Sequence, residues 1–385
     1  MSRKTKGFII ALSVTSSLCL LEGLVIFNLS ALSSKTLNAR STTPTSEDVR
    51  ERLIQLQREA RSRAALYNLQ IEQGMLLDGM VVDRNHSGDA LSVCDSLLFS
   101  SLRYRSLVAL GFEDSARKAW EAILLSRDRG HWWRHPLCSH ESLSRDMLMG
   151  LLVALEASPP GAKKLVEELL AEIQSRGGSF SDGPIFVSYL SPGPAGLLRH
   201  LAERFNVGSA KWPWVLKQSF SSIEYDALFI KPGFESHLAA LGLWLEYQFM
   251  NHGSGFNPRS ILGELEKVLV AKPTGPSPKR MGTIDGSRML WVANTVAQAN
   301  PNNLFFATLR LQISGGLTDG ARLAMLETLL AMPQFPPDRL PQDCDKDADY
   351  LWQRKDSDYA SKQKQCDVSY PGVDYLWMAG ILAGP

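Results

Sequence analysis

Acidic side chains stand where two strongly apolar helices are expected to begin. Asp95 precedes the segment 96–110, and Asp146 opens the stretch 145–156, which is apolar on nearly every side after its first two residues. Hydrolysis of a glycosidic bond uses two carboxyl groups that flank the scissile bond, about 5–10 Å apart. We therefore expect Asp95 and Asp146 to form a catalytic pair, provided that the fold brings both to one cleft.

Further polar residues at helix starts are candidates for contacts with a substrate. The set comprises Asp89, Arg145, His237, Arg288, Asp374 and Tyr375. Helix capping is the alternative for each residue taken alone, because short polar and acidic side chains satisfy the free N–H groups of a first turn. Arg145 does not fit that alternative, because a cation in the first turn interacts unfavourably with the positive end of the helix dipole, which costs about 0.3–1 kcal/mol. Pairing with carboxylates, or binding of an anionic group, would explain it.

An aromatic and basic loop lies between the two helix starts. The run GHWWRHPLCSH, residues 130–140, contains Trp132, Trp133, Arg134 and His135. Tryptophan faces stack on sugar rings, and arginine binds carboxylates or phosphates. The histidines of this loop lack the spacing and the further ligand of a metal site. We expect substrate contacts from the loop, with neither metal nor cofactor; a packed aromatic loop is the alternative.

Two other functions use overlapping residues. A polysaccharide lyase acting on an anionic glycan would draw on His86, His135, His237, Tyr375 and Arg145. A non-catalytic glycan-binding or scaffold protein of the envelope would keep the aromatic and arginine contacts and have no working acid–base pair. All three hypotheses remain open at the level of the sequence.

The predicted architecture is all-α. Segments rich in Leu, Ala, Gly and Ser on all faces alternate with segments that have one charged face. A helix that is apolar all round is buried, whereas a one-sided helix lies at the surface. Regular alternation predicts an inner and an outer layer, that is, an (α/α) toroid or barrel whose inner helices run parallel and open their N-terminal ends on one face. An α-solenoid is the alternative, but the sequence has no repeat of fixed period.

A resemblance supports this architecture. The segments GDALSVCDSLLFSSLRYRSLVALG and WWRHPLCSHESLSRDMLMGLLVAL, within Gly88 to Leu155, resemble inner-helix segments of α/α-toroid carbohydrate-active proteins, a class of glycoside hydrolases and polysaccharide lyases. The likeness lies in acidic residues that head inner helices and in the aromatic loop between them. It implies a glycan as substrate or partner, and it transfers no catalytic residue position by position.

The N-terminal segment predicts a membrane anchor. Residues 1–6 carry three cations and read as a cytoplasmic tail, and residues 7–32 are long and apolar enough to span a bilayer. Residues 33–46 form a polar linker, and 47–385 form the toroid domain. The positive-inside rule places that domain on the periplasmic or extracytoplasmic side of the inner membrane, attached by one pass. A cleaved signal peptide is the rival interpretation.

The charge balance argues against a nucleic-acid-binding protein, and the cysteine content agrees with an exported one. Lys plus Arg number 41 and Asp plus Glu 40, so the chain lacks the basic excess of a nucleic-acid-binding protein. Cys19 lies in the apolar run, and the other four cysteines permit three pairings. We expect Cys94–Cys138 and Cys344–Cys366, because each pair would join neighbouring loops in an oxidising compartment.

Overall fold

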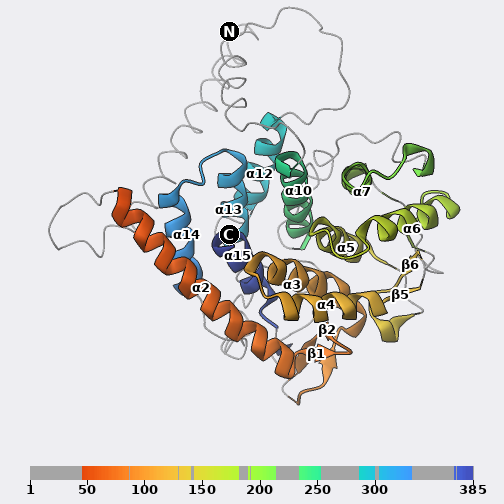
Figure 1. Cartoon of the computed structure of the whole chain (residues 1–385), viewed down its shortest axis with the longest axis horizontal. Coiled ribbons are helices and arrows are strands. Elements are labelled where there is room, and N and C mark those ends of the chain that lie inside the picture. The colour runs from red at the N-terminus through yellow and green to blue at the C-terminus, as the bar shows by residue number, and fades with distance from the viewer. Residues whose placement is uncertain are drawn as a thin grey trace, which may run out of the picture. The chain divides into compact units, whose positions relative to one another are not determined.

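A computed structural model describes residues 46–85, 87–128, 130–139, 143–181, 190, 192–213, 234–252, 286–299, 303–331, 368–369 and 371–384. The chain divides into two compact units, residues 1–48 and 49–385, and the second is the one analysed below. This unit is mostly helical with little sheet, as predicted (Figure 1). The predicted anchor 7–32 lies outside the described residues. Within the described ranges, no helix is at once long enough and apolar enough to cross a bilayer.

The helices are α2 (Ser46–Gly74), α3 (Ser96–Leu110), α4 (Glu113–Leu125), α5 (Arg145–Glu156), α6 (Ala162–Ser175), α7 (Pro192–Arg204), α10 (Phe234–His252), α12 (Gly286–Ala299), α13 (Leu304–Ile313), α14 (Asp319–Ala331) and α15 (Val373–Ala383). Short strands connect some of them: β1 (Leu76–Leu77), β2 (Met80–Val81), β3 (Asp83–Asn85), β4 (Ala90–Leu91), β5 (Arg127–Asp128), β6 (His131–Trp132) and β7 (Val368–Ser369). Two 3-10 turns, η1 (Val93–Asp95) and η2 (Pro136–Cys138), precede α3 and α5.

Two kinds of helix alternate in the first half of this unit. Every residue of α5 from Met147 to Glu156 is buried, and α3 is buried on most of its circumference. In contrast, α4 and α6 bury one stripe each and expose a charged face. The predicted alternation of wholly buried and one-sided helices is thus present in α3 to α6.

The helices α3 and α5 run side by side in the same direction. Near their beginnings, the backbone N–H of Leu98 lies 3.3 Å from Sδ of Met147. Near their ends, Nε of Arg105 donates to Oε2 of Glu156 at 2.6 Å. Gly150 permits this approach, because a Cβ atom at that position would lie 2.6 Å from Cα of Leu98. The two N-terminal ends are therefore neighbours.

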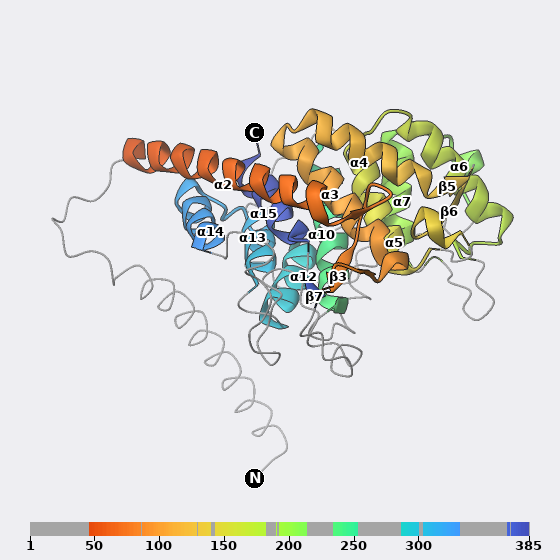
Figure 2. The same ribbon diagram turned by 90° about the horizontal axis from the view of Figure 1, so that it is seen from below.

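Three more buried helices share this direction. In α10 and α13, His237 contacts Asn303 and Phe306 near the two beginnings, and Gln248 and Gln312 line one pocket near the two ends. In α15, the last residues pack on the last residues of α3, and the chain end thereby returns to the first buried helix. Figure 2 shows β3 and β7 at one end of α15 and the C-terminus at the other.

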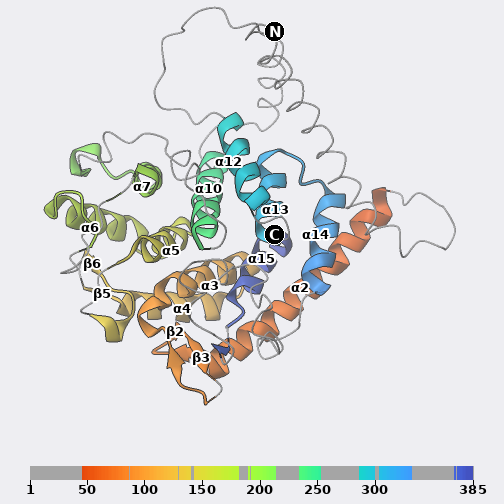
Figure 3. The same cartoon turned by 180° about the vertical axis from the view of Figure 1, so that it is seen from behind.

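The remaining helices cover this set. α12 and α13 pack together across a connection of four residues, 300–303, so they form an antiparallel pair. α2 lies along α14 and α15 (Figure 3), where Arg63 donates to the carbonyl of Leu330 and Tyr67 stacks on Tyr375 with ring centroids 4.4 Å apart. Because α12 runs opposite to α13, its first turn is not at the end where the five parallel helices begin.

A small antiparallel sheet precedes two of the parallel helices. β3 pairs with β4 through Arg84 and Ala90, and with β7 through Arg84 and Ser369. β4 leads into η1 and α3, and β7 leads into α15. The sheet therefore fixes the entry of the chain into both helices at their N-terminal ends.

Candidate functional site

A disulfide joins the turns that lead into α3 and α5. Cys94 in η1 is bonded to Cys138 in η2, with their Cα atoms 5.7 Å apart. The first predicted pairing is therefore confirmed. The second predicted pair, Cys344 and Cys366, lies outside the described residues. The bond constrains the two segments that position Asp95 and Asp146.

The two predicted catalytic carboxyl groups both keep contact with solvent. Asp95 is 57% exposed and forms an ion pair with Arg134, with 3.1 Å between Oδ1 and Nη1. Asp146 is half-buried in the first turn of α5, and it accepts a hydrogen bond from the hydroxyl of Ser144. The structure therefore places one accessible carboxyl group at the beginning of each of two neighbouring parallel helices.

The first turns of α3 and α5 receive no capping hydrogen bond from their N-cap side chains. Asp95 and Ser144 occupy the N-cap positions of α3 and α5, yet neither side chain accepts a hydrogen bond from the first turn of its helix. Asn303, by comparison, caps α13 through its Oδ1, which accepts from the N–H groups of Phe305 and Phe306. A side-chain capping hydrogen bond is thus present at α13 and absent at Asp95 and Ser144, while Asp146 lies in the first turn of α5, where the helix dipole favours a carboxylate.

Three more predicted substrate contacts lie near solvent. Arg145 is exposed and makes no ion pair or hydrogen bond with any other described residue. Trp133 is half-buried and meets the ring of His131 edge-on, with centroids 5.5 Å apart. Asp89 is exposed, but its Oδ2 accepts from Nδ2 of Asn85 at 2.9 Å, which makes it part of a local turn.

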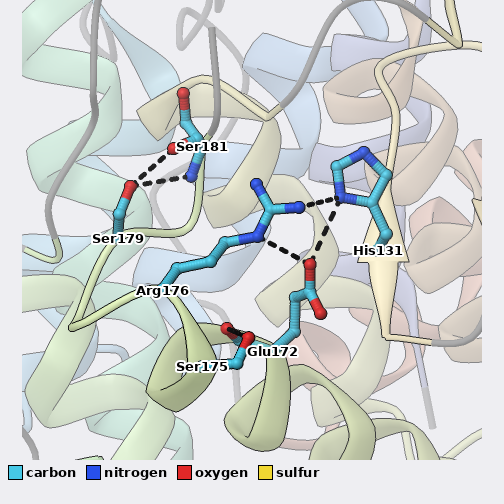
Figure 4. A network of polar contacts seen from close by, with 6 residues as sticks. All are labelled: His131, Glu172, Ser175, Arg176, Ser179 and Ser181. Atoms are coloured by element: carbon cyan, nitrogen blue, oxygen red, sulfur yellow. Dashed lines mark hydrogen bonds and ion pairs between the residues drawn. The ribbon is translucent and has the colours of Figure 1, made fainter.

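The base of the aromatic loop is fixed to α6. Nε of Arg176 donates to Oε1 of Glu172 at 2.6 Å, and Nη2 of Arg176 lies 3.1 Å from Nδ1 of His131 (Figure 4). Beside them, the hydroxyl of Ser179 donates to the carbonyl of Ser181. This network orients β6 at the base of the loop, and the half-buried Trp133 is the residue that comes directly after β6.

Two residues of the same loop are buried instead of open to a substrate. Trp132 is packed in the core, with the Arg127 guanidinium 5.9 Å from its ring centroid. His135 is fully buried; its Nδ1 accepts from the N–H of Leu137 at 3.1 Å, and its Nε2 donates to the carbonyl of Leu77 at 3.2 Å. Burial lowers the pKa of His135, so it is a neutral residue that holds the loop in place.

The predicted contacts from the later helices are also buried. His237 is fully buried, with Nε2 3.4 Å from Nδ2 of Asn303. Tyr375 packs on Tyr67, and burial raises the pKa of its hydroxyl well above the ordinary value. Asp374 is 9% exposed, and its Oδ1 accepts from the N–H of Tyr375. These side chains support the fold and are not accessible to a ligand.

Three of the residues that the lyase hypothesis would use are buried. His135, His237 and Tyr375 are buried on different elements, and His86 lies outside the described residues. The backbone of Arg288 lies in the first turn of α12, the helix antiparallel to α13, and its side chain is not described. Within the described part of the chain, no group of three or more His, Cys, Asp or Glu side chains could hold a metal ion.

A pocket of about 440 Å³ lies at the opposite ends of the parallel helices, where the sequence predicted none. Its walls come from the later parts of α3, α10 and α13 and from α15, and they include Arg105, Trp244, Tyr247, Gln248, Gln312 and Trp377. The signal that could have revealed it is a long polar side chain in the second half of a largely buried helix, as at Arg105 and Gln312. We call this cavity the C-terminal pocket.

A buried charge network borders the C-terminal pocket. Glu156, the last residue of α5, is 2% exposed and accepts from Nε of Arg105 at 2.6 Å and from Nη1 of Arg204 at 3.2 Å. The Arg105 guanidinium lies 5.3 Å from the ring centroid of Trp244. Trp244 in turn meets Trp377 edge-on at 4.7 Å. The network fixes the positions of three pocket walls relative to one another.

Comparison with known proteins leaves the family open. No family model matches the chain, and no curated protein matches it. Among solved structures, a variant of the type II terpene cyclase MstE from Scytonema, in complex with its substrate geranylgeranyl dihydroxybenzoate, is similar over 86% of this chain and 99% of that chain. The sequence identity is 12% and the TM-score 0.38, values at which the likeness carries no argument about function.

Proposed function

We propose that this chain is a glycan-active hydrolase of the cell envelope whose active site lies at the N-terminal ends of α3 and α5. The observation that carries the proposal is the pair of accessible carboxyl groups, Asp95 and Asp146, on two parallel neighbouring helices whose entry turns are joined by a disulfide. Asp95 occupies an N-cap position without making a capping hydrogen bond, which supports a role for it in binding or catalysis.

The two carboxyl groups have different surroundings, which suggests different roles. Asp95 has the Arg134 guanidinium beside it, which stabilises a negative charge, so it serves as nucleophile or as the base that activates water. Asp146 then protonates the glycosidic oxygen as the bond to the anomeric carbon breaks. Attack by Asp95 would retain the anomeric configuration, whereas attack by water activated by Asp95 would invert it.

The arrangement around the pair supports the wider proposal. Parallel buried helices, with α15 returning to pack on α3, are what a closed α/α toroid would contain. Disulfides persist mainly outside the reducing cytoplasm, so Cys94–Cys138 supports an extracytoplasmic location, with residues 7–32 as the anchor. Trp133 and the exposed Arg145 would contact sugar rings and polar groups of the glycan.

Glycan cleavage by the full-length chain tests the proposal. The chain, purified in a detergent without a sugar headgroup, is incubated with peptidoglycan and a panel of bacterial polysaccharides, and new reducing ends are measured. We expect Asp146→Asn and Asp95→Asn each to lower turnover by about 100-fold or more while thermal unfolding stays unchanged. Asp114→Asn is the matched control, because Asp114 is an exposed carboxyl group in the first turn of the outer helix α4.

Each other outcome has a defined meaning. Unsaturated ends detected by ultraviolet absorbance would replace the hydrolase with a lyase. Equal turnover in Asp146→Asn and the unaltered chain would remove Asp146 from the mechanism.

A glycan-binding protein without catalysis is the second candidate. The supporting observation is that Asp95 and Asp146 already have local partners in Arg134 and Ser144, as they would in a site that does no acid–base chemistry. Retained binding of a glycan, with no turnover of any substrate by the unaltered chain, would favour this candidate over the hydrolase.

A further inference from the structure

We propose that the C-terminal pocket is a second binding site, specific for a neutral sugar unit, and that it works independently of the carboxyl pair. Along α3, Arg105 stands ten positions after Asp95, so the rise of an α-helix separates the two by roughly 15 Å. The pocket and the carboxyl pair therefore lie at opposite ends of the same helices. The proposal does not rest on the hydrolase function.

The size and walls of the pocket suit a small ligand. Its volume of about 440 Å³ falls within the range of roughly 300–1,000 Å³ typical of small-molecule sites. Aromatic walls come from Trp244, Tyr247 and Trp377, and amide walls come from Gln248 and Gln312. Aromatic faces beside a few convergent polar groups are what sugar rings require, because such rings have apolar C–H faces and a polar rim.

Charge around the pocket favours a neutral ligand over an anion. The Glu156 carboxylate is shared by Arg105 and Arg204 and offsets one of their two positive charges, so one positive charge remains. Against it, α3, α13 and α15 end at the pocket and α10 ends about one turn beyond it, and each helix C-terminus carries roughly half a negative charge. The summed partial charges of the helix ends exceed the one remaining positive charge, which disfavours a phosphate or a carboxylate there.

Unpaired polar atoms indicate the hydrogen-bonding character of the ligand. The indole N–H groups of Trp244 and Trp377 and Oε1 of Gln312 are buried without a hydrogen-bond partner among the described residues. Arg105 uses its Nε for Glu156, and its two terminal nitrogens have no partner among the residues that the structure describes. The pocket walls thus offer both donors and an acceptor.

Sugar hydroxyl groups match this mixture, because each can donate and accept. An anion, which only accepts, would leave Oε1 of Gln312 unsatisfied. A hydrocarbon would leave every one of these groups unsatisfied, at the full desolvation penalty. Movements of the two indole rings and of the Gln312 amide are required for these buried atoms to reach a ligand, whereas the terminal nitrogens of Arg105 need none.

Titration of the full-length chain with defined sugars tests the site. The probes are cellobiose, maltose and N,N′-diacetylchitobiose, each up to millimolar concentration, with glucuronate and inorganic phosphate as anionic comparisons. Binding is followed by calorimetry and by tryptophan fluorescence, in a detergent without a sugar headgroup. We expect saturable one-to-one binding of at least one neutral disaccharide, and weaker binding of both anions.

Variants locate the binding. Trp377→Phe removes one unpaired N–H and keeps an aromatic wall, and we expect it to weaken binding about 10-fold. Gln248→Ala, on a half-buried side chain with little risk to folding, should weaken binding several-fold. Trp291→Phe is the matched control, because Trp291 is 45% exposed on α12 and absent from the pocket wall.

The outcomes separate this site from the carboxyl pair. Asp146→Asn should bind the neutral disaccharide as tightly as the unaltered chain, whatever its effect on turnover. The proposal is overturned by failure of all three neutral disaccharides to bind, by tighter binding of glucuronate or phosphate, or by Gln248→Ala and Trp377→Phe binding as the unaltered chain does.

Discussion

The two ends of the parallel helices use polar residues in opposite ways. At the N-terminal ends of α3 and α5, Asp95, Arg134 and Arg145 keep contact with water, and a disulfide holds the entering turns. At the C-terminal ends, Glu156 is buried between two arginines and aromatic rings line a cavity. One set of helices thus presents exposed charges at one end and a pocket lined by aromatic and amide side chains at the other.

The connections between helices account for much of this contrast. At the C-terminal ends, α3 passes to α4 through Gly111 and Phe112 alone, and Gly111 adopts φ +74°, which a residue with a side chain rarely does. Before α3 and α5, by comparison, the chain inserts strands, a 3-10 turn and the cystine. The short α3–α4 connection leaves the end of α3 free to line the C-terminal pocket, and the longer connections before α3 and α5 build a loop-rich surface suited to a large substrate.

The largest expected effect is the loss of the disulfide. Replacing Cys94 and Cys138 together by serine should lower the free energy of unfolding by about 4 kcal/mol, because the bond closes a loop across a sequence separation of 44 residues. Urea unfolding without reductant measures the change. In the native state, glycan turnover should fall and disaccharide binding at the C-terminal pocket should persist. Loss of both functions to the same extent would mean that the two ends are not independent.

Gly150→Ala tests the close approach of α3 and α5. An added Cβ atom would lie 2.6 Å from Cα of Leu98, so the two backbones must move apart, at about 3 kcal/mol. Gly242→Ala in α10 is the control, since its Cβ atom would meet Cε of Met149 at 3.5 Å, an ordinary contact. The control should be neutral or slightly stabilising in thermal unfolding. Equal melting temperatures for the two variants would contradict the helix contact described above.

Glu156→Gln tests the charge network at the other end. The change keeps the volume of the side chain and removes the charge that the largely buried Arg105 and the exposed Arg204 share. We expect a loss of about 2 kcal/mol, less than for a fully buried pair because the arginines reach some solvent. Glu203→Gln, an exposed partner of Arg199 on α7, should change stability by less than about 0.5 kcal/mol. A similar small change for both variants would show that the network is dispensable.

The same comparison shows how far sequence reasoning reaches. Helical content, the alternation of α3 to α6 and the Cys94–Cys138 bond follow from apolar periodicity and cysteine spacing. Which candidate side chains are buried could not be predicted from the sequence. His237 and Tyr375 lie at helix starts, as Asp95 does, but neighbouring helices cover them. The C-terminal pocket was missed because its walls come from four helices that are distant in sequence, and pattern within one helix does not reveal which side chains converge.

Two histidines, one near each end, give the smallest predicted effect. Burial lowers the pKa of His135 under the aromatic loop, against the smaller opposing effects of the Leu77 carbonyl and Asp78. Burial also lowers the pKa of His200 on α7, which stacks on Phe249 in the last part of α10. At these two histidines, the unfolded chain binds protons that the folded chain does not bind. The free energy of unfolding should therefore fall as the pH drops below about 6.5.

His135→Asn and His200→Asn assign that dependence to the two ends. Asparagine does not titrate, so each variant should show a shallower loss of stability between about pH 7 and pH 5, measured by urea midpoints. The amide introduced by His135→Asn keeps an acceptor for the N–H of Leu137, and the comparison of slopes removes the constant cost of the lost Leu77 contact. An unchanged slope in His135→Asn, with a shallower one in His200→Asn, would place the acid sensitivity at the C-terminal ends alone. The aromatic loop at the N-terminal ends would then stay in place throughout this pH range.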